Sequence, residues 1–430
     1  MELYSYQEAF GASDKTSRAM RKAVAQWFGM YYQQEANDQA DPCQRIAYTV
    51  VNKLTKAVFG EYQAKSRDEN VDKWLRQLEL QKKEAMQLAL TGGECYIKPC
   101  PNGTGFSYTL VPRNQMLIFA RNGKGEPVDV GMTERSTFGR HYYTLLERRT
   151  LDKNGLVTIT YRLFRSGSAE KFGTEVDLAE HPDYKHLAKK LQYDLGSVGM
   201  VRVKTPMVNC VDGSADGVAV FAPAVQLIEA IDRNEAQMNG EFLRGQSRII
   251  VSRDLLDKEC NLTENLFVGL DEDPESVGMT VFSPQLREQS YLARKQEYLR
   301  NVESVLGLKR GSLSDANLDE RTATEIAASQ ADYNLTVMDF QEMWARAVQE
   351  TMDLCARLAR IYAMVTECDT AVQFDWGNGV LYDVEKVWAD YLQMVDQNLI
   401  APEVALGWRF GMPAETEQQR KAIRQKYMPK

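Results

Sequence analysis

Histidine is scarce in this sequence of 430 residues, and its cysteines form no paired motifs. The only histidines are His141, His181 and His186, and neither H-E-x-x-H nor H-x-x-E-H occurs. The seven cysteines are scattered, at Cys43, Cys95, Cys100, Cys210, Cys260, Cys355 and Cys368. Zinc sites need closely spaced ligands of these types, so we expect no zinc site. The odd number of cysteines, without a C-x-x-C pair, favours reduced thiols.

Long apolar runs are also missing. No eighteen consecutive apolar residues occur, whereas a transmembrane helix needs about twenty. The first residues, MELYSYQEAF, lack the basic and then apolar layout of a secretory signal. We therefore expect a cytoplasmic chain with no membrane partner.

The motifs of nucleotide-binding and hydrolytic enzymes are absent as well. The sequence contains no G-x-x-x-x-G-K-[ST], no G-x-G-x-x-G after a predicted strand and no G-x-S-x-G. The stretch TGGECYIKP at 91–99 contains two glycines, but it is better explained as a tight helix-to-strand turn than as a phosphate loop. We expect a protein that is not an enzyme and has no cofactor.

The chain has a formal net charge of -8, which argues against tight binding to DNA through many phosphate contacts. Loose contact is compatible with this charge, because a passage that lets a polyanion slide must not hold it. The C-terminal basic residues Arg420, Lys421, Arg424, Lys426 and Lys430 favour a solvated helix over a nucleic-acid contact. The consecutive acids Asp271, Glu272 and Asp273 are typical of a solvated loop, and a magnesium-dependent nuclease remains the enzymatic alternative.

The periodicity of apolar residues predicts an α+β fold. Residues 1 to about 90 show helical spacing, as at Met20, Val24 and Trp27. Between about 91 and 210 apolar and polar residues alternate, and Asn-Gly pairs recur at 102, 122 and 154. This pattern predicts antiparallel hairpins. The stretch 211–222, rich in small residues, predicts a boundary.

Two helices are expected to bracket a compact insert. Helical spacing covers 223–244 and again 286–307, and the residues between them contain the strand-like stretches SRIIVS and MTVFSP around the acidic loop LDEDPES. If these two helices pack antiparallel, the insert must project from one end of the pair.

A glycine- and serine-containing stretch with mixed charges follows, and then a long helix. Thr322 and Glu325 match the capping box S/T-x-x-E, which predicts a helix beginning at Ala323. Apolar positions continue for about 42 residues, to Tyr362 and slightly beyond, which would make a rod of roughly 63 Å. Few single domains can cover so long an apolar stripe, so we expect something large to flank it. A strand at 371–376 and short helices at 384–396 and 402–410 should follow.

Several of these segments together resemble the portal proteins of tailed double-stranded-DNA phages, particularly the siphophage type. The strongest match is ESVLGLKRGSLSD followed by ERTATEIAASQADYNLTVMDFQEMWARAVQETMDLC, where a helix, Gly-Leu, a variable loop and a T-A-T-E start to a long helix occur in order. ALTGGECYIKP, YYTLLERRTLDKNGLVTITYRLFRS, FAPAVQLIEAIDRNEAQMNGEF and NLIAPEVALGWRFGMP add support. The resemblance extends over most of the chain after residue 85.

The resemblance implies a subunit with an α/β wing, a two-helix stem, a small α/β clip, a long wing helix and a short helical crown. The corresponding residues are 1–222 for the wing, 223–244 and 286–307 for the stem helices, 245–285 for the clip, 308–322 for a tunnel loop, 323–375 for the long wing helix and a strand, and 376–430 for the crown. Only about fifty residues follow the strand at 371–376, so the crown is expected to be reduced.

The resemblance also implies a function without catalysis. Portal proteins form rings, usually dodecamers, whose channel admits the genome during packaging and releases it at ejection. The partners implied are further copies of the chain, the terminase large subunit, a head-completion or adaptor protein, the major capsid and scaffolding proteins, and double-stranded DNA that passes without sequence specificity. The location implied is the capsid portal vertex of the virion, with host cytoplasm during assembly. The alternative is a structural or scaffold protein of the phage head that forms no channel.

Two sets of candidate site residues follow from this resemblance. The tunnel loop would present a balanced set of charges and mobile small residues to DNA: Lys309, Arg310, Gly311, Ser312, Asp315, Asn317, Asp319, Glu320 and Arg321. The clip would offer acidic residues to docking partners: Asp271, Glu272, Asp273 and Glu275. Taken without the resemblance, the mixed-charge loop is most simply an exposed connector.

Overall fold

The computed structural model describes residues 7–32, 43–103, 105–245, 248–252, 267–270, 279–282, 286–315, 323–377, 384–414 and 416–428. At 248–252, 267–270, 279–282, 323–331 and 384–387 the description covers the backbone only. Helices and mainly antiparallel sheets alternate along the chain, which confirms the predicted α+β class.

The helices extend over most of the lengths that the apolar spacing predicts. The described α-helices are α1 (Gln7–Phe10), α2 (Arg18–Tyr32), α3 (Ile46–Val58), α4 (Glu69–Glu79), α5 (Lys82–Gly92), α6 (Val225–Arg244), α8 (Glu288–Val305), α9 (Ala323–Ile361), α10 (Val384–Asp396), α11 (Pro402–Arg409) and α12 (Glu417–Tyr427). Short 3-10 turns are η2 (Arg113–Gln115), η3 (Leu178–Glu180) and η4 (Ala222–Ala224).

The strands form four sheets in the described part of the chain. They are β1 (Gln63–Ser66), β2 (Glu94–Asn102), β3 (Gly105–Pro112), β4 (Met116–Arg121), β5 (Pro127–Phe138), β6 (His141–Leu151), β7 (Leu156–Ser166), β8 (Thr174–Val176), β9 (Lys190–Asp194), β10 (Val201–Lys204), β11 (Arg248–Ser252), β12 (Phe267–Leu270), β13 (Met279–Phe282) and β14 (Val372–Asp375). The sheet orders are β1-β14, β10-β2-β3, β12-β11-β13 and β4-β5-β6-β7-β8, with β9 also paired to β7.

Each predicted Asn-Gly pair lies at a turn between antiparallel strands. Asn102 ends β2, Asn122 follows β4, and Asn154 lies between β6 and β7. In the second and third of these turns the asparagine or aspartate at the start of the turn, Asn122 or Asp152, accepts hydrogen bonds from backbone amides two and four residues later. Hydrogen bonds within these turns therefore stabilise the hairpins that the sequence predicted.

One face of the long helix α9 is buried within its own chain, so the large element expected to flank its apolar stripe is the body of the same chain. Val337, Trp344, Val348 and Cys355 are fully buried in one core with residues of α3, α4, β2 and β10. The helix begins at Ala323 as predicted but ends at Ile361, so Tyr362 lies beyond it and is exposed. The body of the molecule, which we define as residues 7–224 with α9 and β14, supplies the cover.

The second half of the stretch 211–222, where the sequence predicted a boundary, is buried in the body, whereas residues 212–214 are exposed. Val218 and Phe221 are fully buried. Gly217 lies against Gly93, the left-handed residue (φ 81°) between α5 and β2, and a Cβ on Gly93 would come within 2.3 Å of the Gly217 carbonyl carbon. Both glycines are required because two backbones meet there. The turn predicted in TGGECYIKP is present at this point.

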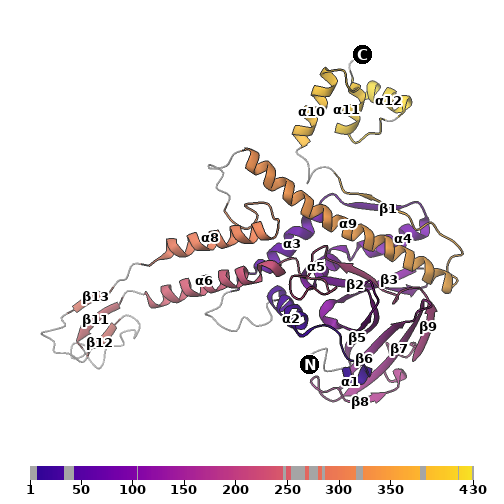
Figure 1. The fold of residues 1–430 in the computed structure, drawn as a ribbon, viewed down its shortest axis with the longest axis horizontal. Helices are drawn as coiled ribbons and strands as arrows, with labels where there is room; N and C mark the ends of the chain where they lie inside the picture. Colours follow the sequence, from indigo (N-terminus) through magenta and orange to yellow (C-terminus); the bar gives the residue numbers. More distant parts are fainter. Residues whose placement is uncertain are drawn as a thin grey trace.

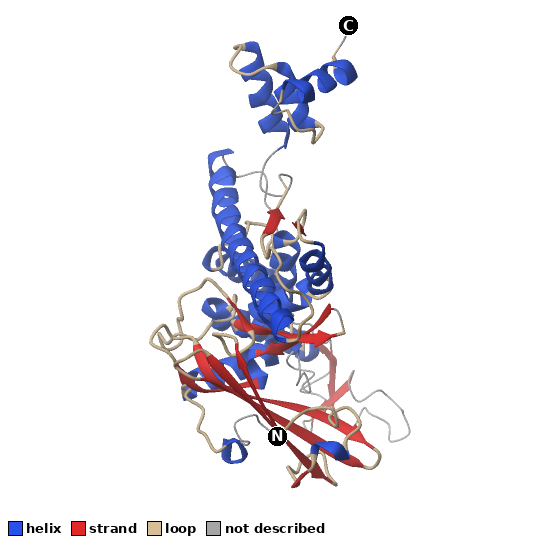
Figure 2. Ribbon diagram, turned by 90° about the vertical axis from the view of Figure 1, so that its right-hand side faces the viewer, coloured by secondary structure: helices blue, strands red, loops and turns tan. Residues whose placement is uncertain are grey.

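Figure 1 shows α6 and α8 leaving the body side by side, with β11, β12 and β13 at their far end. β11 pairs parallel with β12 and antiparallel with β13. The helices α10, α11 and α12 form a separate group above α9 in the view of Figure 1. Figure 2 shows most strands of the body gathered at the lower end of α9. Along the chain, the first helix of the pair, the small sheet, the second helix of the pair and the C-terminal helices follow one another in the order that the sequence predicted.

Replacing Trp344 with Ala should lower the free energy of unfolding by about 3–5 kcal/mol, because it empties a fully buried site. The indole packs edge-on against Phe59, with ring centroids 5.4 Å apart, and its Nε1 donates to the Tyr62 hydroxyl at 3.2 Å. Urea unfolding followed by circular dichroism measures the change. The control is Leu80→Ala, at a position that is 79% exposed, which should change stability by less than about 0.5 kcal/mol. Equal stability of the two variants would contradict this account of the core.

Candidate functional site

The antiparallel pair α6 and α8 projects from the body and carries the small sheet β11 to β13 at its far end (Figure 1). Near the body the two helices share apolar contacts, since Ile228 and Ile231 of α6 and Leu299 and Val302 of α8 are buried. The spacing of these residues by three positions on each helix puts them on one face. The pair is thus anchored at one end by the hydrophobic core.

Polar contacts continue along the pair where the apolar core ends. The Asn234 amide donates to the Tyr291 carbonyl at 3.1 Å, and Lys295 Nζ lies 2.9 Å from the Glu235 carboxylate. At the far end Arg287 forms two side-chain hydrogen bonds, of 3.1 and 2.9 Å, with Glu241. These bonds from Arg287 lower the pKa of Glu241 to about 2. Polar and charged side chains, which can remain in contact with water, therefore link the two helices along their length.

Large apolar side chains remain exposed on this pair and on the neighbouring part of α9. They are Phe242, Leu243, Leu286, Leu292, Val305, Leu335 and Met338. Isolated exposed apolar residues are ordinary, but here they recur along the elements that leave the core. Their exposure is the observation that points to a protein partner.

The C-terminal end of α8 is closed by a Schellman motif. The Gly307 amide donates to the Ser304 carbonyl, and the Leu308 amide donates to the Glu303 carbonyl at 2.9 Å. Gly307 has a φ of 62°, and a Cβ there would lie 2.7 Å from the Thr336 hydroxyl of α9. Leu308 is buried. The Gly-Leu pair that contributed to the resemblance is thus a helix stop packed against α9.

The first half of the predicted tunnel loop is held by the buried carboxylate of Glu303. One carboxylate oxygen accepts from the Leu313 and Ser314 amides at 2.5 and 2.8 Å, and the other accepts from the Gly311 amide at 3.2 Å and the Ser314 hydroxyl at 2.8 Å. Two further contacts hold the same stretch: Lys53 Nζ donates to the Ser312 carbonyl, and the Asp315 amide donates to the Gln296 side chain.

These contacts give Gly311, Ser312 and Ser314, which the sequence led us to expect in a mobile loop, defined hydrogen-bond partners. The backbone of 311–315 is hydrogen-bonded to α8 and α3, because a buried carboxylate needs donors and this segment supplies them. The side chains of Lys309 and Asp315 are exposed at its two ends. Between Leu308 and Asp315 the structure shows a segment that carries charged side chains and whose backbone is held by hydrogen bonds.

The remaining predicted site residues fall outside the described part of the chain. They are Asn317, Asp319, Glu320, Arg321 and the cap residue Thr322 of the tunnel loop, and Asp271, Glu272, Asp273 and Glu275 of the clip. Glu325 lies in the first turn of α9, where only the backbone is described. Their roles remain predictions.

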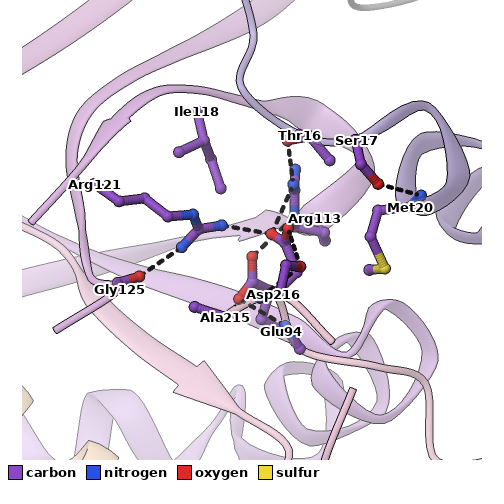
Figure 3. A network of polar contacts seen from close by, with 12 residues as sticks. Thr16, Ser17, Met20, Glu94, Arg113, Ile118, Arg121, Gly125, Ala215 and Asp216 are labelled. Carbon is purple, nitrogen blue, oxygen red and sulfur yellow. Dashed lines mark hydrogen bonds and ion pairs between the residues drawn. The ribbon is translucent and has the colours of Figure 1, made fainter. Parts of the chain in front are cut away.

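A second polar cluster, unforeseen from the sequence, lies inside the body (Figure 3). Glu94 is completely buried and lies 2.8 Å from Arg113 and 2.6 Å from Arg202. Asp216 accepts from Arg113 at 3.2 Å and from Arg121 at 2.5 Å. The cluster joins β2, η2, β4, β10 and the 211–222 stretch, and alternation alone could not reveal it, because a charged residue on a strand normally indicates an exposed face.

The electrostatics of this cluster indicate a structural role. Burial by itself would raise the pKa of Glu94, but the charges of Arg202 and Arg113 outweigh it and hold that pKa below its ordinary value. The ionised carboxylate is therefore the stable form, with both of its oxygens bonded to arginines. A general acid or base needs a pKa near neutrality and access to substrate, and Glu94 has neither.

Other surfaces of the described chain offer little chemistry. A groove of ≈ 810 Å³ runs between α9 and β10, with acidic and basic side chains such as Glu350, Asp353, Arg346 and Lys204 in its lining but neither histidine nor cysteine. No group of three or more potential metal ligands occurs among the described residues. Among those same residues, no helix is both long and apolar enough to cross a membrane.

The basic residues Arg420, Lys421, Arg424 and Lys426 lie on the helix α12, as expected, whereas Lys430 lies outside the described residues. The fold partly neutralises this helix. Arg424 of α12 pairs with Glu403 of α11 and lies 3.9 Å from Glu417. Lys421 and Lys426 are exposed. The three helices α10, α11 and α12 are joined by stacked aromatic rings, such as Trp388 with Trp408.

Replacing Glu94 with Gln should lower the free energy of unfolding at pH 7 by about 3–5 kcal/mol, because Arg113 and Arg202 lose their shared counter-charge. The folded-state pKa of Glu94 is lowered, so its contribution is fully present above the ordinary carboxyl pKa of about 4.3. It is lost as the pH falls through the lowered value.

The difference between wild type and E94Q, measured by urea unfolding, should therefore narrow below about pH 4. The control is E126Q, because Glu126 is half exposed and lies 3.4 Å from Arg202, so its loss should cost less than about 1 kcal/mol. A gap between wild type and E94Q that stays constant from pH 7 to pH 3 would contradict the ionised state assigned to Glu94.

Comparisons with solved structures and with known families complete the site description. One similar structure is described as the neck of a native GTA particle computed with C12 symmetry, with 12% identity, coverage of 96% of this chain and 99% of that chain, and a TM-score of 0.45. Another is the neck of an empty GTA particle computed with C6 symmetry, with 13% identity, coverage of 95% and 98%, and a TM-score of 0.48. No curated protein sequence matches the chain.

The family profile described as phage portal protein, SPP1 Gp6-like, matches residues 44–426. The match includes α3 to α9, the small sheet at the end of the helix pair, and almost all of the C-terminal helices. It agrees with the resemblance drawn from the sequence. The chain therefore belongs to the phage portal protein family, whose members are structural rather than catalytic components of the virion capsid.

Proposed function

We propose that copies of this chain assemble into a ring, a dodecamer, at the capsid vertex, and that double-stranded DNA passes through its central channel during packaging and ejection. The match to the portal family over residues 44–426 is the observation that carries this proposal. Passage without sequence specificity fits the net charge of -8, because a channel that neutralised many phosphates would hold the DNA.

In this proposal each part of the chain has one role. The body is the wing, the pair α6 and α8 is the stem, the sheet β11 to β13 belongs to the clip, and α10 to α12 form a reduced crown. The segment after α8 is the tunnel loop. The projecting helix pair with a small sheet at its end supports this division, since such an element is costly to expose unless neighbours cover it.

The partners proposed are those expected of a passive conduit. The clip would dock the terminase large subunit and later a head-completion or adaptor protein, while the wing would meet the major capsid and scaffolding proteins. Assembly would take place in the host cytoplasm. The absence of a P-loop motif from the sequence supports a separate ATPase as the source of energy for translocation.

Subunit contacts in the ring would cover the exposed apolar residues of the stem. Leu292 and Val305 both lie on α8 and are about half exposed, whereas their neighbours Leu299 and Val302 are buried in the chain itself. A closed ring repeats one such heterologous interface at every subunit. A substitution that introduces a charge at one of these residues would therefore disrupt the contact between every pair of neighbouring subunits.

Replacing Leu292 with Arg should abolish rings while leaving the melting temperature of the monomer within a few degrees of wild type, because the side chain is exposed in the single chain. Negative-stain electron microscopy and mass photometry of the purified protein measure assembly. L80R is the matched control, at an exposed leucine of the body, and it should still assemble. Wild-type protein that forms closed shells or fibres without an axial hole would favour the alternative of a head protein without a channel.

Replacing Lys309 with Glu should leave rings intact but reduce DNA packaging several-fold, because it reverses an exposed charge on the segment assigned to the channel. The measurement is DNase-protected DNA in a packaging reaction that contains procapsids and terminase. K83E reverses an exposed lysine of α5 and serves as control. Equal packaging by wild type, K309E and K83E would place Lys309 outside the DNA path.

A further inference from the structure

The carboxylate of Glu303 is unusual among the buried acids of this protein because its described partners are uncharged. Glu94 and Glu147 are bonded to arginine or lysine side chains. Glu303, only 1% exposed, instead accepts from three backbone amides and one hydroxyl of residues 311–314. A buried carboxylate without such donors is strongly unfavourable, so its stability depends on the position of this short segment.

The segment 311–314 in turn depends on the Glu303 carboxylate. The amides of Gly311, Leu313 and Ser314 converge on one anion in the manner of a backbone anion nest. They lie only eight to eleven residues after Glu303 in the same chain, so bringing them together costs little loop-closure entropy. The Schellman motif at Gly307 already turns the chain back toward α8. All of these contacts are made within one chain.

We propose that Glu303 is a positioning residue that fixes the backbone of 311–314 to the end of α8, and that it does so in the single chain before any ring forms. Lys53 on α3 binds the Ser312 carbonyl within this segment, and Gln296 on α8 binds the Asp315 amide directly after it. The consequence for DNA rests on the proposed function: Lys309 would enter the channel at a position set by α8 and would move only with that helix.

Amide hydrogen exchange of the full chain tests this inference without reference to DNA. Exchange is followed for residues 311–314 in wild type, E303A and E303Q, on the unassembled and assembled fractions separated by size exclusion. E303A removes all four acceptor contacts, so exchange in 311–314 should accelerate roughly tenfold or more. E303Q keeps one oxygen but presents an N–H group to the remaining donors, so its effect should be intermediate.

A matched control lies on the same helix. Glu297 is largely exposed, and E297A should leave exchange in 311–314 unchanged. S314A removes only the hydroxyl contact and should give a smaller acceleration than E303A. If E303A does not fold, the comparison of E303Q with wild type decides the question.

Three outcomes would overturn the proposal. Exchange in 311–314 that is unchanged in E303Q and E303A would show that the carboxylate does not hold the segment. Acceleration spread equally over α8 and α9 would show a general loss of stability instead of positioning. Protection present only in the assembled fraction would show that neighbouring subunits hold the segment. Failure of the protein to form rings would leave the measurement on the single chain intact, so the two hypotheses fail independently.

Discussion

One hydrophobic core buries a face of α9 against α3, α4, β2 and β10, and the same core includes the inner ends of α6 and α8. Trp344 is at the centre of this contact, and Thr336, two turns earlier, lies against Gly307 at the end of α8. The inner end of the helix pair and Leu308 belong to the same hydrophobic core that stabilises the body. Because apolar burial is the largest favourable term in folding, this shared core anchors the pair at one end.

The buried charged groups of this protein are stabilised in two different ways. The cluster of Glu94, Arg113 and Asp216 joins strands and a loop that are distant in sequence, and each charge there has a partner of opposite sign. Glu303 meets the same requirement with neutral donors from a neighbouring segment. In both cases the cost of burying an ion demands a defined geometry, which is why these residues organise backbone instead of performing chemistry.

Much of the fold could be predicted because its signals are local. The Asn-Gly turns, the start of α9 at Ala323 and the bracketing helices α6 and α8 each depend on a few adjacent residues or on helical spacing. The hydrogen bonds that hold 311–314 could not be predicted, because glycine and serine indicate flexibility only when nothing accepts their hydrogen bonds. The sequence around Glu303 contains no recognisable motif that would identify this residue as the acceptor.

The sequence by itself determined the α+β class, the order of the elements and the membership in the portal family, since these depend on periodicity and on residues close together in the chain. Only the tertiary structure decided that the body covers α9 and that Glu303 holds the segment after α8. It also placed Asp216 beside Arg113. The physical reason is that burial and ion pairing depend on which residues meet in space, whether they lie eight positions apart, as Glu303 and Gly311 do, or about a hundred apart, as Arg113 and Asp216 do, and no local pattern specifies which of them will meet.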